Sequence, residues 1–290
     1  MNFEEFTQNV KENIKHRIDS DKNVMLQTVQ KNNGMTYEGL VIIDPLLNIS
    51  PTIYLEPFYH NYLNGTPLPD IYDNILHVYE EFVPENDFDV TLFTDYEKAK
   101  ERIIMKLINQ ERNQDLLKKI PYIPFLDLAI VFVCAACDFN REYATILIYN
   151  EHMLHWGIDV NTLYQVAQKN TPYLLPFHFE DLENYLTKHT DWPSCNDHLP
   201  MYLLTNRLKI HGACVMIYEG MLEWIAKELN SSFVIIPSSV HETLIIPVSS
   251  KKELSSFTRM LIDVNTTQLS KEEILSDQAY YYSKTTHTLS

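Results

Sequence analysis

Residues 233–247 read FVIIPSSVHETLIIP, and this stretch decides the fold class. Two β-branched runs, 233–236 and 243–246, flank a polar insert, and a proline follows each run. Runs of this length and composition are typical of buried strands, and proline is tolerated at the ends of strands. The stretch therefore predicts two core strands joined by a tight polar connection.

The first part of the chain predicts a helix, a β-hairpin, a third strand and two more helices. Phe3, Phe6, Val10 and Ile14 recur at helical spacing. Asn33-Gly34 separates two strand-like runs, and Asn-Gly is the strongest short signal for a hairpin. Residues 1–120 are therefore expected to form a helix-hairpin-strand-helix unit, with a helix at 3–18, strands at 24–30, 36–43 and 48–56, and helices at 57–63 and 70–82.

The rest of the chain, 121–290, predicts a larger mixed α+β unit. Pro121 and Pro124 suggest a soft boundary before it, although one continuous domain is the alternative. Strands and helices alternate irregularly, so the fold class is α+β, with mixed β-sheets and packed helices rather than a regular βα barrel. Besides the two central strands, this unit is expected to hold strands at 126–136, 143–149, 201–205 and 213–218 and helices at 159–169, 220–229 and 250–265.

The composition excludes several classes of protein. The 290 residues carry a net charge of −16, which disfavours direct binding to nucleic acids or to anionic lipid surfaces. The chain has only six glycines and no G-x-G-x-x-G or G-x-x-x-x-G-K motif, so no nucleotide cofactor is predicted. No apolar run reaches the roughly 18 residues that span a bilayer, and no signal peptide is recognisable. A cytoplasmic protein is expected.

Acidic residues are concentrated in one segment. Residues 70–101 contain ten acidic side chains against Lys98 and Lys100, a net charge of −8. A solvated surface that keeps the protein soluble explains such a run, and so does a negative patch for a basic protein partner. The candidates for partner binding are Glu80, Glu81, Glu85, Asp87 and Asp89.

The polar insert of the central stretch is the candidate catalytic site. Ser239, His241 and Glu242 supply a hydroxyl, a base and a carboxylate, the groups that acyl transfer requires. However, residues two and three apart on one loop rarely converge, and the serine lies outside a G-x-S-x-G motif. Ser239-x-x-Glu242 is also the pattern of a capping box, so a capped turn is the alternative interpretation.

Four further residue groups have a structural and a functional interpretation. His152 and His155 are three apart beside Glu151 but lack the H-E-x-x-H pattern, so no metal site is predicted. Cys134 and Cys137 have C-x-x-C spacing at the end of an apolar run, which favours core thiols over a redox pair. Asp127 and Glu56 lie in apolar surroundings, where a buried carboxylate must be hydrogen-bonded or functional.

Several longer phrases resemble a domain-of-unknown-function family of gut Firmicutes. The likeness covers nearly the whole chain, carries no assigned activity, and implies an association with mobile elements and hence an accessory or host-interaction role. The phrases are 48–55 (NISPTIYL), 149–152 (YNEH), 156–158 (WGI), 170–176 (NTPYLLP), 204–206 (LTN), 212–213 (GA) and 236–242 (IPSSVHE).

Two functions therefore remain. The favoured hypothesis is a non-catalytic acidic protein that acts by binding a basic host protein. That partner could be one whose basic site normally binds nucleic acid. The alternative is a hydrolase whose cleft around 238–242 gathers His152 and Asp127 or Glu56 from elsewhere in the chain. The sequence does not predict an oligomeric state.

Overall fold

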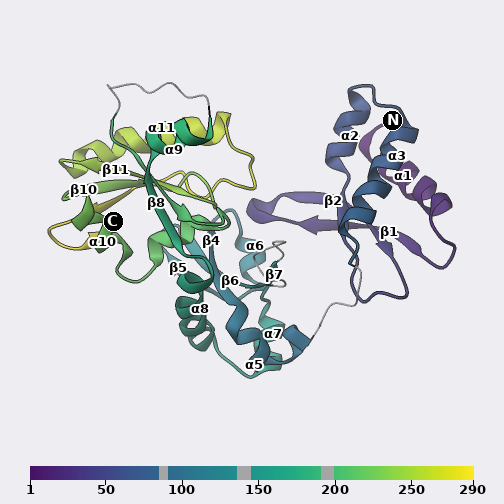
Figure 1. Cartoon of the computed structure of the whole chain (residues 1–290), viewed down its shortest axis with the longest axis horizontal. Coiled ribbons are helices and arrows are strands. Elements are labelled where there is room, and N and C mark those ends of the chain that lie inside the picture. Colours follow the sequence, from purple (N-terminus) through teal and green to yellow (C-terminus); the bar gives the residue numbers. More distant parts are fainter. Residues whose placement is uncertain (85–90, 136–144, 191–198) are drawn as a thin grey trace. The chain divides into compact units, whose positions relative to one another are not determined.

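The computed structural model describes residues 1–84, 91–135, 145–190 and 199–290. The chain forms two compact units, one of Met1–Lys31 and Met35–Val90, the other of Asn32–Gly34 and Thr91–Ser290 (Figure 1). The boundary falls after Val90 rather than near 120, because strand β4 (Ile103–Asn109) pairs with β6 (Leu128–Ala135) of the second unit. No helix among the described residues is long and apolar enough to cross a membrane.

The N-terminal unit is a small α+β fold in which helices pack against one sheet. Its antiparallel sheet has the strand order β1-β2-β3, and side chains of the sheet and of the helices share one core. The predicted N-terminal helix and hairpin are confirmed, and Asn33 and Gly34 have φ angles of 57° and 68° at the turn. The elements are α1 (Phe3–Arg17), β1 (Asn23–Gln30), β2 (Thr36–Ile43), β3 (Thr52–Tyr54), α2 (Glu56–Leu63) and α3 (Leu68–Phe82).

The second unit contains two antiparallel sheets. One has the order β13-β12-β10-β11-β9-β8, and in the other β6 pairs with β4, β5 and β7. Its strands after β4 and β6 are β5 (Tyr122–Phe125), β7 (Thr145–Leu147), β8 (Phe177–Asp181), β9 (Tyr202–Asn206), β10 (Ser232–Ile236), β11 (Thr243–Val248), β12 (Tyr280–Ser283) and β13 (Thr288–Leu289). The helices are α4 (Thr91–Thr94), α5 (Tyr96–Ala99), η2 (Lys100–Arg102), α6 (Gln114–Leu117), α7 (Asn150–Trp156), α8 (Val160–Leu174), α9 (Leu182–His189), η3 (Gly212–Ile217), α10 (Met221–Glu228), η4 (Lys251–Glu253) and α11 (Leu254–Thr267).

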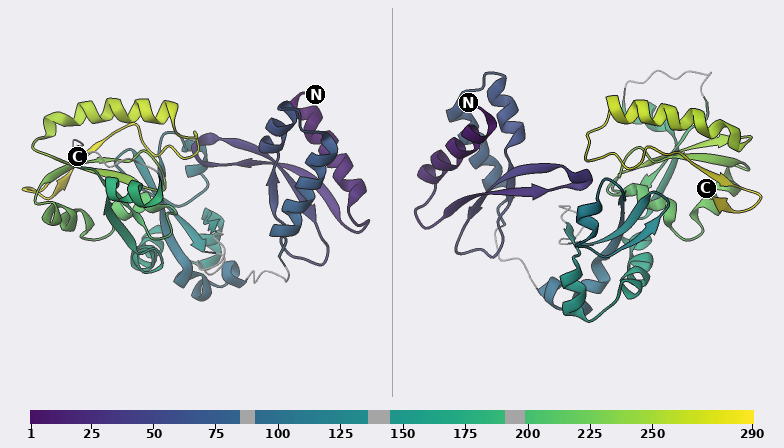
Figure 2. Two further views of the ribbon diagram at one scale, coloured as in Figure 1. Left: turned by 45° about the horizontal axis from the view of Figure 1, so that its top comes forward. Right: turned by 180° about the vertical axis from the view of Figure 1, so that it is seen from behind.

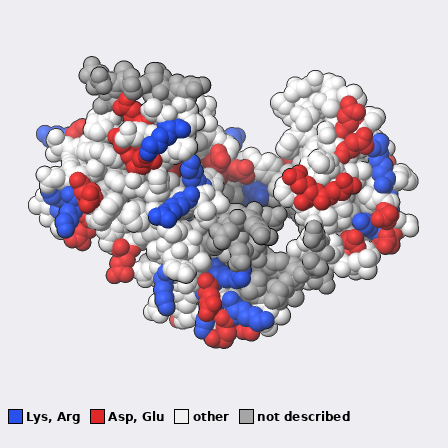
Figure 3. Space-filling model, viewed as in Figure 1, with Lys and Arg blue, Asp and Glu red and all other residues white. Residues whose placement is uncertain are grey.

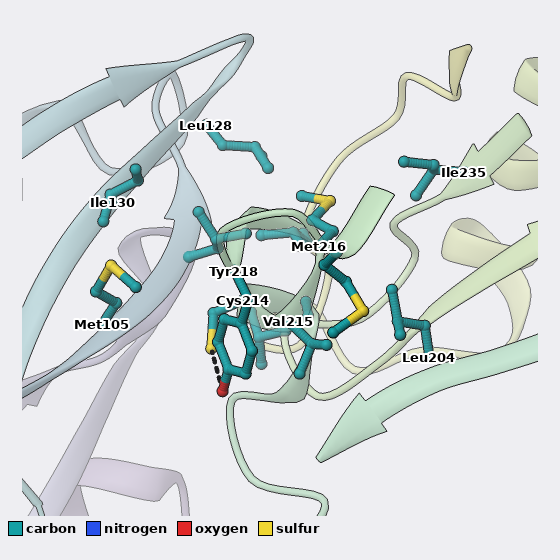
Figure 4. Close-up of a cluster of buried hydrophobic side chains, with 14 of the residues drawn as sticks. Met105, Leu128, Ile130, Leu204, Cys214, Val215, Met216, Tyr218 and Ile235 are labelled. Atoms are coloured by element: carbon teal, nitrogen blue, oxygen red, sulfur yellow. Dashed lines mark hydrogen bonds between the residues drawn. The ribbon is translucent and has the colours of Figure 1, made fainter. Parts of the chain in front are cut away.

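The predicted central strands are β10 and β11, and both faces of β10 are buried. Phe233 and Ile235 point into the main core with η3 and β6, whereas Val234 and Ile236 pack with Leu261 of α11 on the opposite face. Successive side chains of a strand point to opposite faces, so a strand between two cores needs an unbroken apolar run. Figure 2 shows α11 lying along this sheet, and Figure 4 shows the core on its other face.

One predicted strand is wrong. Residues 213–218 belong to the 3₁₀ helix η3, and its first five residues, Gly212 to Met216, are all buried. A continuous apolar run indicates burial, but it does not distinguish a strand from a short helical segment that is surrounded by core. In Figure 4 this segment lies between the two sheets, and the thiol of Cys214 donates to the Tyr218 hydroxyl at 3.9 Å.

Candidate functional site

The connection between β10 and β11 is held rigidly by backbone hydrogen bonds on one side. The amides of Leu275 and Ser276 donate to the carbonyls of Ser238 and Pro237 at 3.0 and 3.1 Å. The Val240 amide donates to the carbonyl of Glu273 at 2.9 Å. The segment before β12 therefore fixes the shape of this connection.

On its other side the connection packs against β9 and the start of η3. The Thr205 hydroxyl donates to the His241 carbonyl at 2.7 Å, and the Ala213 amide donates to the Val240 carbonyl at 3.3 Å. Gly212 passes so close that a Cβ atom there would lie 2.2 Å from the His241 carbonyl oxygen. Only glycine fits this approach without displacing its neighbours.

Ser239 closes a turn with its side chain. Its side chain is 3% exposed, and its Oγ accepts a hydrogen bond from the His241 amide at 3.0 Å. Among the described contacts, no hydrogen bond joins the Ser239 hydroxyl to an imidazole or the His241 ring to Glu242. The geometry is that of a side chain that stabilises its own turn.

His211 is part of the site, although no sequence motif marks it. The ring of His211 stacks on that of His241, with centroids 6.1 Å apart and planes 14° apart. His211 precedes η3 with a left-handed φ of 52°, which turns the chain toward the β10–β11 connection. No sequence signal pairs these two histidines, because their contact depends on how β9, η3 and β11 assemble.

His211 is buried, His241 and Glu242 are half-buried, and burial changes the pKa of His211 and of Glu242. Burial lowers the pKa of His211 well below its usual value, and Lys106 and His241 lower it further. Burial raises the pKa of Glu242, with Glu273 adding to the effect while His241 and Lys209 oppose it. The Nδ1 atom of His241 is buried without a hydrogen-bond partner among the described residues.

Two stacked imidazoles and a carboxylate surround a turn whose serine hydroxyl already accepts a backbone hydrogen bond. Within the described parts of the chain, no three His, Cys, Asp or Glu side chains come together as metal ligands.

Asp127, His152 and Glu56 form hydrogen bonds elsewhere in the structure. Asp127 accepts hydrogen bonds from the hydroxyls of Ser276, at 2.6 Å, and Tyr280. His152 Nδ1 accepts from the Tyr149 amide at the start of α7, and Glu56 accepts from the Glu38 amide at 2.7 Å. The structure gives these three residues no described hydrogen bond to residues 238–242.

The cysteines that the structure describes are core thiols. Cys134 is buried on β6, and burial raises its pKa to about 11. Cys214 is buried in η3, where burial raises its pKa to about 12. Thiols with such high pKa values are not reactive nucleophiles at neutral pH. Cys137 lies outside the described residues.

The structure describes two of the five candidate residues for partner binding. Glu80 and Glu81 lie exposed near the end of α3, whereas Glu85, Asp87 and Asp89 lie outside the described residues. Asp70 and Asp73 are exposed earlier on the same helix, and Arg17 forms an ion pair with Asp73. Residues at these spacings share one face of a helix, opposite the buried side chains of Ile71, Ile75 and Tyr79.

We expect acid to destabilise the protein through His211. The folded-state pKa of His211 lies below the unfolded value, so the unfolded chain binds the extra proton first. Stability is therefore full above about pH 6.5 and is lost as pH falls below it, by up to about 1.4 kcal/mol per pH unit. Glu242, with a raised pKa, opposes this slope, because its contribution is full below its unfolded pKa and is lost as pH rises through its folded pKa.

Urea unfolding of the wild type and of His211→Gln, from about pH 7 to pH 5, measures this slope. The variant should lose most of the dependence on pH even if it is less stable throughout. His155→Gln, at an exposed position of the same unit, serves as the control and should keep the wild-type slope. Equal slopes in all three proteins would contradict the assignment.

The sequence model of DUF5688, a family of unknown function, matches residues 3–284. Neither the curated proteins nor the solved structures include a significant match to the chain.

Proposed function

Because this chain belongs to DUF5688, a family of unknown function, we propose its role from its own surface: it binds a basic protein partner through the acidic side chains of its N-terminal unit. The proposal is a non-catalytic one. The observation that carries it is that residues 35–90 of this unit contain ten acidic residues and neither lysine nor arginine. Arg17 and Lys22 pair with Asp73 and Asp44, and the exposed carboxylates that remain give this segment a negative potential.

The acidic residues of α3 that the structure describes support one shared negative surface. Asp70, Glu80 and Glu81 are exposed on one face of α3, and no described ion pair involves them. Figure 3 shows acidic side chains spread over the N-terminal unit. Complementary charges of this kind steer association and select the partner, whereas buried apolar contacts supply most of the affinity.

A basic protein that normally holds nucleic acid fits this surface best. Its binding site presents lysine and arginine side chains for phosphates, and a negative protein surface offers carboxylates in their place. The proposal places the chain in the cytoplasm, where such host proteins act. On a mobile element of a gut bacterium, occupation of that site would blunt a host defence.

The binding should depend steeply on salt and on the α3 carboxylates. Raising the ionic strength from about 0.05 to 0.5 M shortens the screening length to a few ångströms and should weaken capture about tenfold or more. The triple variant Asp70→Asn, Glu80→Gln, Glu81→Gln should weaken capture at low salt by a similar factor. Quantitative pull-down from host lysate, followed by titration of the purified partner, measures both effects.

A second triple variant controls for net charge. Glu228→Gln, Glu253→Gln and Asp263→Asn remove three exposed carboxylates from the other unit, so both triple variants have the same formal charge. The control should bind like the wild type. Equal weakening by both triple variants, or a captured partner indifferent to salt, would refute the proposed surface.

A further inference from the structure

The second unit contains a cavity of about 390 Å³ away from the β10–β11 connection. Its walls come from β5 and β6, from α8, from the end of η3 and the start of α10, and from β12 and β13. Cavities of about 300–1,000 Å³ with mainly apolar walls are typical of sites for small molecules. The volume therefore suits a small organic ligand.

The walls are mainly aromatic and apolar, with one carboxylate and one imidazole. The rings of Phe125, Tyr164, Tyr218 and Tyr282 line the cavity, together with His287 and methionines of η3 and α10. Glu223 is the only acidic side chain in this lining, and neither lysine nor arginine belongs to it. Glu223 is exposed, so it lies where the cavity meets solvent.

The side chains of this cavity favour a positively charged ligand. The faces of aromatic rings attract organic cations, and a carboxylate adds direct attraction to an ammonium group. An anionic ligand would meet the Glu223 carboxylate, and the described lining holds no lysine or arginine to balance that charge; His287 is its one imidazole. Burial and the charge of Glu223 raise the pKa of Tyr282, so its hydroxyl stays protonated.

We propose that this cavity binds a small organic amine, with the ammonium group beside Glu223 and the apolar part of the ligand against the aromatic rings and the methionines. The site is independent of the acidic surface of the other unit, because the two share no residue. A phosphorylated or carboxylated metabolite is not expected to bind.

Three probes of the same size test the charge preference. Calorimetric titration of the full chain with 3-phenylpropylamine, 3-phenylpropanol and 3-phenylpropanoate should show the amine binding at least about tenfold more tightly than the other two. Glu223→Gln should remove most of this preference and leave the binding of the alcohol unchanged. Glu228→Gln, at another exposed position of α10, is the matched control and should bind like the wild type.

Methyl spectra of the methionines locate the bound probe without any variant. The amine should shift the methyl signals of Met216 and Met221, which line the cavity, and leave those of the exposed Met25 and Met260 unchanged. Equal affinities for the three probes, an unchanged amine affinity in Glu223→Gln, or unshifted signals from Met216 and Met221 would each overturn the proposal. So would filling of the cavity by a second copy of the chain, seen as a concentration-dependent dimer that the amine does not dissociate.

Discussion

Gly212→Ala is expected to lower the free energy of unfolding by about 3 kcal/mol, and the cause is steric. An added Cβ atom would lie 2.1 Å from Thr205 Oγ1 and 2.2 Å from the His241 carbonyl oxygen. These two oxygens are hydrogen-bonded to each other, so moving either one breaks the contact that joins β9 to the β10–β11 connection. Urea denaturation followed by circular dichroism measures the loss.

Gly157→Ala provides the comparison. Gly157 ends α7 with a φ of 67°, and an added Cβ atom there would meet nothing within 4 Å. Its replacement should cost only the strain of a left-handed alanine, about 1–2 kcal/mol. If Gly212→Ala costs no more than Gly157→Ala, the close approach at Gly212 does not hold the connection in place.

Asp127→Ala should be destabilising by about 2–4 kcal/mol, because it leaves two buried hydroxyls without their acceptor. Asp127 lies between β5 and β6 and accepts from Ser276 and Tyr280, which are 0% and 4% exposed. Burial and the neighbouring Asp127 carboxylate raise the pKa of Tyr280, so its hydroxyl remains a donor throughout the neutral range.

A double-mutant cycle measures the interaction between Asp127 and Tyr280 separately from the other effects of removing the carboxylate. Tyr280→Phe removes one donor and should cost less than Asp127→Ala, because Ser276 still donates to Asp127. The double variant should be more stable than the sum of the two single losses predicts. Strictly additive losses would show that Asp127 and Tyr280 do not stabilise each other.

Local sequence patterns predicted most of the helices and strands. The contacts of the candidate site depend on packing between distant segments, which these patterns do not show. The hairpin at Asn33-Gly34 and the central pair β10–β11 were predictable, because turn residues and β-branched runs act on the neighbouring chain. The stacking of His211 on His241 and the bonds of Asp127 join segments far apart in the sequence. Their partners become neighbours only after the sheets form, so no spacing reveals them.

Prolines misled the prediction of the domain boundary. Pro124 lies inside β5, where it pairs with Ala129 of β6. β5 is an edge strand of its sheet, and a missing amide donor is tolerated on an edge. Pro172 similarly lies inside α8, which continues to Leu174 although its expected end was near 169. Proline therefore indicates a position that needs no amide donor, which is not always a boundary.

The two neighbours of β10 leave the ribosome at different times. β11 follows β10 directly, whereas β12, which covers the other edge of β10, begins only at Tyr280. Until Tyr282 stacks on Phe233, a nascent chain exposes an apolar strand with unpaired backbone groups. Apart from the hairpin turn at 32–34, which groups with later residues, the N-terminal unit lies within residues 1–90 and is synthesised first. A pause in synthesis between residues 248 and 280 would therefore leave this apolar edge exposed, and such an edge favours aggregation.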